Sequence, residues 1–132
     1  MSTVDWRIAP YFIVDDVAAT ATYYRDRLGF RYERIWGDPP CFCMVWRSGV
    51  CIMLSQFAKP TAMNPNGRVL PDDDRPWDAY IWIDDADALL AEFKAQGVTI
   101  ARDICDQPYG NRDFDILDCN GYCLCFGHDL SG

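Results

Sequence analysis

The chain is poor in positive charge and in histidine. Its 12 lysine and arginine residues stand against 20 aspartates and glutamates, which gives a net charge of −8, and His128 is the only histidine. The basic residues form no cluster, which argues against nucleic-acid binding, because phosphate contacts require local positive charge. An acidic surface instead attracts cationic ligands over long range. No serine stands in a nucleophile-elbow motif that could use the single histidine, and no glycine-rich phosphate loop is present.

Long apolar runs are also missing. Asp5, Arg7 and Asp15 interrupt the N-terminal segment, which does not resemble a signal peptide. No stretch approaches the ~20 apolar residues of a membrane helix. We therefore expect a cytoplasmic protein with no membrane partner. A chain of 132 residues can bury about two thirds of its unfolded surface as a single domain.

The cysteines do not form an obvious disulfide framework. There are seven of them, an odd number, and most lie in apolar, strand-like runs, which favours reduced thiols in the core. The pairs Cys41/Cys43 and Cys123/Cys125 each place two thiols on one strand face. Structural zinc sites prefer a spacing of two to four residues between cysteines, so we interpret these pairs as small buried side chains.

What the chain does contain is an internal repeat. The segment from Ile8 to Leu28 recurs about 69 positions later from Trp77 to Gln96, with Val14-Asp15-Asp16 answered by Ile83-Asp84-Asp85. A second similarity relates 48–54 to 120–126. Because order and spacing are both preserved, we predict two copies of one unit packed as a single pseudo-symmetric domain over residues 1–132.

Each copy has the pattern expected of a β-α-β-β-β unit. An extended run ends at the paired aspartates, which can cap a helix, and a glycine follows each helical stretch. Period-two segments rich in β-formers come next. The first unit (6–56) is expected to have strands at 8–14, 30–36, 41–46 and 50–56; the second (77–128) has them before Asp84 and at 99–104, 111–117 and 122–128. The linker 57–76 is expected to be a mobile loop with a solvated acidic tip at Asp72-Asp73-Asp74.

A doubled unit of this kind, with VDD before a helix ending YYRDRLGF and an Asp-x-x-Gly turn at Asp118–Gly121 before the last strand, resembles the vicinal oxygen chelate superfamily. Glyoxalases, extradiol dioxygenases, fosfomycin-modifying enzymes and bleomycin-resistance proteins belong to it. The resemblance covers nearly the whole chain. It implies an α+β fold in which the two tandem βαβββ units form a cup of curled sheet with mixed and antiparallel strands.

The resemblance also bears on metal binding. Metal-using members carry His, Gln or Glu ligands at four strand positions, which here hold Ala9, Met53, Asp78 and Cys125. Alanine offers no donor and a thioether is a poor ligand for a hard divalent ion. His128 lies one residue out of the cup-facing register. We therefore expect no metal, no other cofactor and no catalytic residues.

Within the superfamily, the segment Gln107–Phe114 followed by Leu117–Cys123 is similar to the closing pattern of bleomycin-resistance proteins, with Tyr109 in place of a tryptophan. This resemblance implies a homodimer whose grooves are completed by both chains. Strand register with the four aligned positions makes further side chains face the cup: Tyr11, Ile13, Cys51, Met53, Ser55, Asp78, Tyr80, Trp82, Cys123 and Cys125. Trp36, Trp46, Tyr109 and Phe114 are expected at its rim.

Aromatic walls with an occasional acid suit a flat, cationic and partly aromatic ligand. The expected ligand-binding residues are Tyr11, Met53, Ser55, Asp78, Tyr80, Trp82, Tyr109, Phe114 and Cys125. The sequence thus predicts a metal-free protein that sequesters a cationic aromatic antibiotic of bleomycin type. Two alternatives stay open. One is a metal-dependent lyase, isomerase or dioxygenase with atypical ligands, for example Asp78 with Glu33 or Asp113; the other is a module that binds another protein.

Overall fold

A computed structural model describes residues 5–58, 63, 65, 66 and 76–131. The elements in this part of the chain are β1 (Tyr11–Ile13), α1 (Val17–Asp26), β2 (Ile35–Trp36), β3 (Phe42–Arg47), β4 (Val50–Ser55), β5 (Ala79–Trp82), α2 (Ala86–Ala95), β6 (Thr99–Asp106), β7 (Asn111–Leu117) and β8 (Cys123–Asp129). The β-α-β-β-β order therefore occurs twice, as predicted. Most of the expected linker, including Asp72–Asp74, lies outside the described residues.

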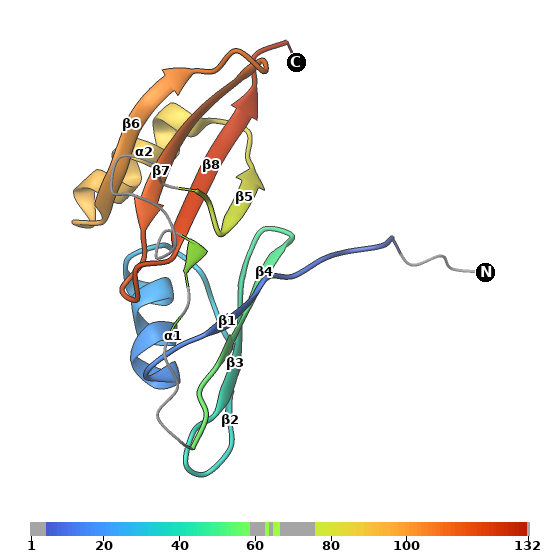
Figure 1. Ribbon diagram of the computed structural model, residues 1–132, viewed down its shortest axis with the longest axis vertical. Coiled ribbons are helices and arrows are strands. Elements are labelled where there is room, and N and C mark those ends of the chain that lie inside the picture. The colour runs from blue at the N-terminus through green and yellow to red at the C-terminus, as the bar shows by residue number, and fades with distance from the viewer. Residues whose placement is uncertain (1–4, 59–62, 64, 67–75, 132) are drawn as a thin grey trace.

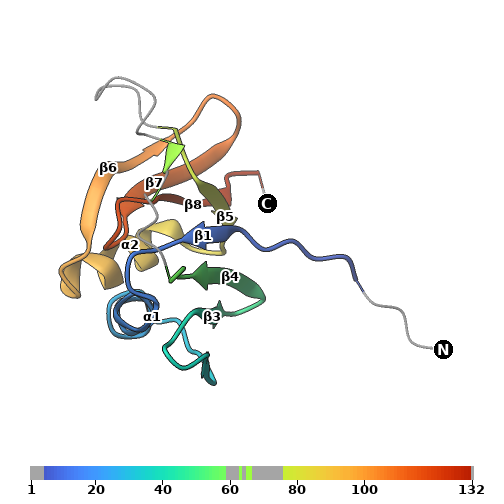
Figure 2. The same ribbon diagram turned by 60° about the horizontal axis from the view of Figure 1, so that its bottom comes forward.

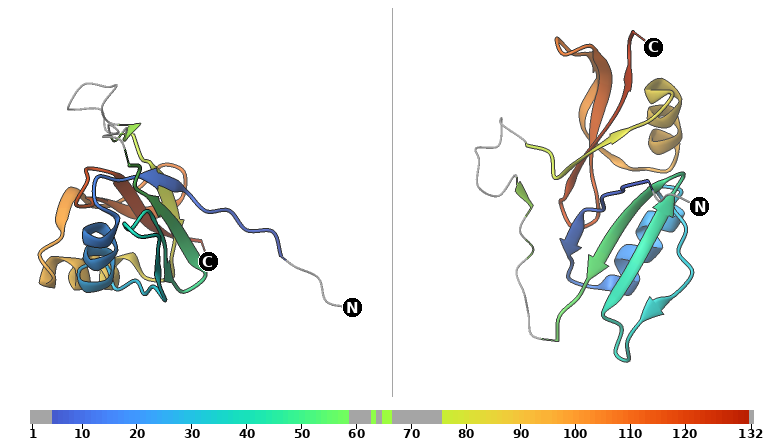
Figure 3. Two further views of the ribbon diagram at one scale, coloured as in Figure 1. Left: turned by 90° about the horizontal axis from the view of Figure 1, so that it is seen from below. Right: turned by 90° about the vertical axis from the view of Figure 1, so that its right-hand side faces the viewer.

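The described strands form two separate four-stranded sheets, with the orders β1-β4-β3-β2 and β5-β8-β7-β6. In each unit the first strand pairs in parallel with the last, and the other pairings are antiparallel. The first unit lies below the second in Figure 1, and Figure 3 shows one helix beside each sheet. This is the predicted α+β fold of two tandem units, with sheets that do not close on each other.

The two units repeat each other at the level of backbone pairing. Equivalent partners recur in both: Tyr11 with Met53 and Phe12 with Leu54 in the first sheet, Tyr80 with Cys125 and Ile81 with Phe126 in the second. The hydrogen bond from Val14 N to Ser55 O at 2.8 Å likewise has its counterpart from Ile83 N to Gly127 O at 2.8 Å. Any position in one unit can therefore be compared with its equivalent in the other.

The aspartate pair that ends each first strand explains where each helix begins. Asp16 accepts a hydrogen bond from Ala19 N at 3.0 Å, and Asp85 accepts one from Ala88 N at 3.1 Å. Both bonds satisfy amide groups that the first helical turn leaves unpaired. None of the helices in the described ranges is long and apolar enough to span a membrane.

The apolar core lies between each helix and the facing side of its sheet, and it is continuous where the units meet. At this junction the rings of Phe12 and Tyr122 stack with centroids 4.2 Å apart and planes 3° apart. The buried Tyr24 hydroxyl donates to Asp118 at 2.6 Å. Burial raises the pKa of that carboxyl above its ordinary value.

Two first-unit strands are shorter than predicted. β1 begins at Tyr11, and residues 5–10 form an extended arm that leaves the body of the molecule (Figure 1; Figure 2). Trp6 and Ile8 on this arm are 101 % and 94 % exposed. The segment predicted as a strand from Phe30 contributes only Ile35–Trp36 and one bridge from Arg31 to Trp46. Its charged, exposed residues leave little apolar alternation to hold a longer strand.

All seven cysteines are free thiols, in line with the prediction of no disulfide framework. Cys43, Cys51, Cys123 and Cys125 are buried, whereas Cys41, Cys105 and Cys119 are exposed. The interpretation of the cysteines as core residues therefore holds for four of the seven.

Candidate functional site

Each sheet has one face that its own helix does not cover, here called the first and second open faces. On β1, β3 and β4 the residues Phe12, Cys43, Val45, Ile52 and Leu54 point into the core. Because side chains alternate along a strand, their neighbours form the first open face: Tyr11, Ile13, Phe42, Met44, Trp46, Cys51, Met53 and Ser55.

The first open face is almost entirely apolar. Tyr11 donates its hydroxyl hydrogen to Ser55 Oγ at 2.7 Å, so the hydroxyl groups of these two residues are paired with each other. A pocket of about 560 Å³ lies between this face and the N-terminal arm, with Trp6, Ile8, Met44, Trp46, Cys51 and Met53 among its lining residues. The Arg7 guanidinium lies 5.8 Å from the Trp46 ring centroid. This surface can hold the apolar body of a ligand.

The second open face is built around two aspartates and one arginine. Asp113 and Asp115 project from β7, and their side chains are 0 % and 5 % exposed. Arg102 on β6 binds both: its Nη2 lies 2.5 Å from Asp113 Oδ1 and 3.0 Å from Asp115 Oδ1, and its Nε lies 3.1 Å from Asp115 Oδ2. Two buried carboxylates thus share one guanidinium.

Further donors surround Asp113. It accepts hydrogen bonds from the Tyr80 hydroxyl at 2.9 Å, from the Gln107 amide at 3.0 Å and from the Tyr109 hydroxyl. Burial raises the pKa of this carboxyl, but the bonds from Tyr109, Gln107, Tyr80 and Arg102 more than offset burial and hold the pKa below its ordinary value. Asp113 is therefore an anion at neutral pH.

Aromatic rings frame this anionic group. The Trp77 ring lies 4.9 Å from Tyr80 and 6.4 Å from Tyr109, and Tyr80 lies 5.2 Å from Trp82, all between centroids. Trp77 also donates its indole hydrogen to Asp115 at 3.0 Å. Trp82 and Tyr109 are 62 % and 52 % exposed, so their rings are available to a ligand. Flat surfaces next to negative charge suit an aromatic cation.

The expectation that Phe114 lies at the rim of the site is wrong. Its side chain is fully buried on the helix side of β7, where its ring packs 6.1 Å from Phe93 and 5.8 Å from Phe126. The neighbours Asp113 and Asp115 occupy the open face instead. The signal for them was present in the sequence, because the alternation Asp-Phe-Asp in a strand places both acids on one face and the phenylalanine on the other.

The expectation that Cys125 contacts a ligand also needs correction. Cys125 faces the predicted side of β8, but it is fully buried, and its Sγ lies 3.8 Å from Arg102 Nη2. Burial and the nearby Asp115 carboxylate raise the pKa of this thiol well above its ordinary value. It forms the floor beneath the arginine as a neutral thiol.

A family model described as the Glyoxalase/Bleomycin resistance protein/Dioxygenase superfamily matches residues 7–126. The chain belongs to this superfamily. No curated protein matches the chain.

Solved structures with this fold include proteins of different kinds. TioX from Micromonospora sp. ML1 has a TM-score of 0.72 and 17 % identity, over 96 % of this chain and 100 % of its own. The bleomycin-binding protein from bleomycin-producing Streptomyces verticillus, complexed with copper(II)-bleomycin, has a TM-score of 0.65 and 24 % identity, over 95 % and 97 %. Lactoylglutathione lyase from Agrobacterium tumefaciens has a TM-score of 0.67 and 16 % identity, over 96 % and 96 %.

The four superfamily metal positions do not suit a divalent metal in this chain. Asp78 uses its carboxylate within the fold: Oδ2 accepts from Cys123 N at 2.9 Å and Oδ1 accepts from Asn66 N at 2.7 Å. Cys125 is a buried neutral thiol, Ala9 has no donor atom, and Met53 offers only a thioether. Among the residues that the structure describes, no three His, Cys, Asp or Glu side chains are grouped as a metal site requires. The sets that join Asp78 to Glu33 or Asp113 are therefore not assembled.

His128 faces away from this site. Its Nδ1 accepts a hydrogen bond from Ala86 N at the start of α2, at 2.8 Å. The imidazole thus supports the helix on the side of the sheet opposite to Asp113.

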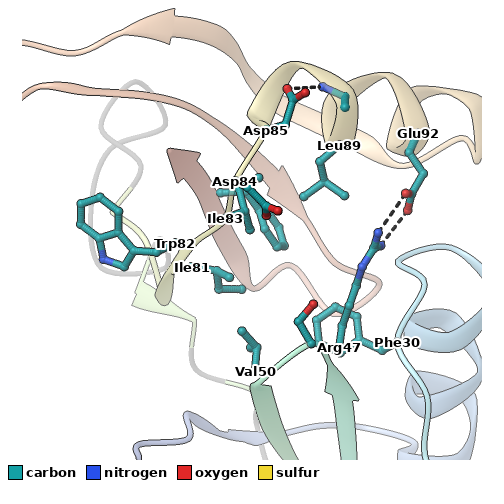
Figure 4. Close-up of a pocket in the computed structure, with 13 residues that line it drawn as sticks. Phe30, Arg47, Val50, Ile81, Trp82, Ile83, Asp84, Asp85, Leu89 and Glu92 are labelled. Atoms are coloured by element: carbon teal, nitrogen blue, oxygen red, sulfur yellow. Dashed lines mark hydrogen bonds and ion pairs between the residues drawn. The ribbon is translucent and has the colours of Figure 1, made fainter. Parts of the chain in front are cut away.

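A further pocket of about 290 Å³ lies at the junction of the two units, away from the open faces. The turn between β3 and β4 forms one wall, and β5 and the first turns of α2 form the other (Figure 4). Sequence reasoning gave no indication of it.

Proposed function

We propose that this protein is a metal-free binding protein that sequesters a cationic, partly aromatic small molecule of the bleomycin type. One observation carries the proposal: on the second open face, two buried carboxylates share a single guanidinium and are framed by exposed aromatic rings. The arrangement leaves one unbalanced negative charge next to Trp82 and Tyr109. A cationic group can balance that charge while a flat ring stacks on either side chain.

The side chains at the superfamily metal positions support binding rather than turnover, because the Asp78 oxygens already accept two backbone hydrogen bonds and Cys125 is a buried thiol. A lyase and a bleomycin-binding protein share the scaffold, so the fold by itself does not decide between them. The residues of the site support binding, because the side chains of Asp78 and Cys125 are engaged within the fold. Sequestration requires only affinity and concentration, and no chemical step is needed.

A homodimer completes the groove in this proposal. Arg31, Glu33 and Arg34 line a pocket of about 330 Å³ at the edge of the first open face, and Arg7 lies beside Trp46, so this edge has a net positive charge. The second open face is acidic, so the basic edge of the first face in one copy and the second face of another copy attract each other. The exposed Trp6 and Ile8 give the arm an apolar surface that a second copy can cover.

Calorimetry with bleomycin and with bleomycinic acid, which lacks the cationic terminal amine, tests the ligand class. We expect the acid to bind at least about tenfold more weakly, because it carries a carboxylate in place of the terminal cation and is repelled by the Asp113–Asp115 pair. Trp82→Ala should weaken bleomycin binding by about tenfold, whereas Leu130→Ala, which removes another exposed apolar side chain, should leave it unchanged. No heat of binding for bleomycin and its relatives would refute the proposal.

Two further measurements address the metal and the dimer. Elemental analysis of protein purified without chelator should give no stoichiometric iron, zinc, nickel or manganese; one metal per chain would favour the enzyme alternative. Sedimentation velocity should give a dimer, and Arg31→Glu with Arg34→Glu should shift it toward monomer. A monomer at all concentrations would remove the shared groove from the proposal.

A further inference from the structure

The pocket at the junction of the units has an apolar floor and an acidic mouth. Val50 from the first unit lines it together with Ile81, Leu89 and Phe126 from the second. Asp84 and Asp85 lie at the edge and are exposed. Figure 4 shows the Trp82 ring turned away from the other lining side chains, so the ring of Trp82 does not fill the space.

Internal symmetry explains why this space is open. Phe12 is the first-unit equivalent of Ile81, because each occupies the same register position in its strand pair. Val50 and Tyr122 are likewise equivalent, because they lie three residues before Met53 and Cys125, which occupy the same register position in their strand pairs. At the first-unit location the Tyr122 ring stacks on Phe12. At the second-unit location, the smaller Val50 and Ile81 leave the corresponding volume unfilled.

The Tyr122 side chain therefore indicates which chemical group the junction pocket can hold. Its phenol ring lies flat on an apolar side chain, and its hydroxyl donates to the Ile13 carbonyl oxygen at 2.5 Å. The carbonyl group equivalent to that of Ile13 belongs to Trp82, at the edge of the junction pocket. A free phenol can use the same stacking surface and the same acceptor.

Charge at the mouth selects among phenols. Arg47, the cation in the lining, is held by Glu92 through two bonds of 2.7 and 2.9 Å and is neutralised by them. Asp84 and Asp85 remain as excess negative charge. A substituent that carries a positive charge is favoured there, and a carboxylate is repelled.

We propose that the junction pocket binds a small phenolic amine, with its ring in the place that Tyr122 occupies in the other unit and its ammonium group beside Asp84. The volume of about 290 Å³ is close to the lower limit of about 300 Å³ for small-molecule sites, which fits a single ring with a short chain. Trp82 is common to this site and the proposed antibiotic-binding face, but it offers its backbone to the pocket and its ring to the open face. The proposal does not depend on antibiotic binding.

Calorimetry and ligand-observed NMR with tyramine as the probe test the proposal. Phenethylamine, which lacks the hydroxyl, and 3-(4-hydroxyphenyl)propionate, which carries the opposite charge, should each bind at least about tenfold more weakly. Amide shift changes on tyramine addition should centre on Asp84 and Leu89. Equal affinity for the three probes, or shift changes confined to the open faces, would overturn the proposal.

A matched test uses variants that place the Tyr122 or Phe12 side chain at the equivalent position in the junction pocket. Val50→Tyr should abolish tyramine binding and keep or raise the melting temperature, because the new ring fills a cavity as Tyr122 does. Ile81→Phe, which copies Phe12, gives a second filled variant if Val50→Tyr folds poorly. Thr99→Tyr adds the same ring at an exposed strand position and should leave tyramine binding unchanged. Full affinity in a folded Val50→Tyr variant would contradict the assignment.

Discussion

The two open faces have equivalent backbones and opposite chemistry. In the first sheet, Phe42 lies opposite Ser55 and Met44 opposite Met53. At the equivalent places in the second sheet, Asp113 lies opposite Gly127 and Asp115 opposite Cys125. Two apolar residues in one unit thus correspond to two buried acids in the other.

Under the proposed function, this difference gives the two units different roles in ligand recognition. The apolar face can hold the body of a ligand without orienting it, since hydrophobic contact has no direction. The acidic face holds a fixed charge whose position is set by Arg102, Tyr80, Tyr109 and Gln107. The two units therefore share their strand register, and the second unit carries the charged open face.

The second face should be far more sensitive to single substitutions than the first, and Arg102→Met gives the largest expected effect. It leaves Asp113 and Asp115 buried without their cation, which should reduce the free energy of unfolding by about 3–5 kcal/mol. Urea unfolding at pH 7 measures it. The triple variant Arg102→Met, Asp113→Leu, Asp115→Met makes this face resemble the first and should recover much of the loss. If Arg102→Met alone were as stable as the wild type, the second face would not be more sensitive to substitution than the first.

Ser55 in the first sheet and Gly127 in the second occupy equivalent positions, and exchanging their side chains should have a smaller effect on stability. A Cβ at Gly127 would collide with the Tyr80 hydroxyl and would lie 2.7 Å from Asp113 Cβ. Gly127→Ser should therefore displace Tyr80 and lower the free energy of unfolding by about 1–3 kcal/mol. Ser55→Gly removes only the Tyr11 bond and adds backbone freedom, at a cost of about 1 kcal/mol. Thermal unfolding of both variants measures their losses of stability. Equal losses would contradict the expectation that the second face tolerates substitution less well.

Sequence reasoning could anticipate the repeat and much of the first face. The VDD segments fix where each helix begins, and period-two register on β1 and β4 places Tyr11, Met53 and Ser55 on one side, because those strands are regular. The expectation that Phe114 lies at the rim did not use the register of β7, and it is wrong because Asp113 and Asp115 hold that face.

Strand periodicity could not predict on which face of the sheet Arg102 lies, for a physical reason. The pairing of β6 with β7 shifts register between Ile100 and Arg102 and again between Arg102 and Cys105. Such irregularities break the strict alternation on which face assignments rest. The junction pocket could not be predicted from periodicity either. It depends on the size difference between Tyr122 and Val50, and the equivalence of their positions becomes evident only in the folded units.

The acid response of the two faces should also differ, and this is the smallest effect. The pKa of Asp113 is held below its ordinary value in the folded state, so its contribution to stability is present above the unfolded pKa of about 3.9 and is lost as pH falls through the folded pKa. The stability difference between wild type and Asp113→Asn should therefore shrink below about pH 4. Phe42→Leu, at the equivalent position, removes no titrating group and should keep a constant difference. Urea unfolding at pH 5, 4 and 3 measures both, and a pH-independent difference for Asp113→Asn would show that its hydrogen bonds do not lower the pKa of this carboxyl.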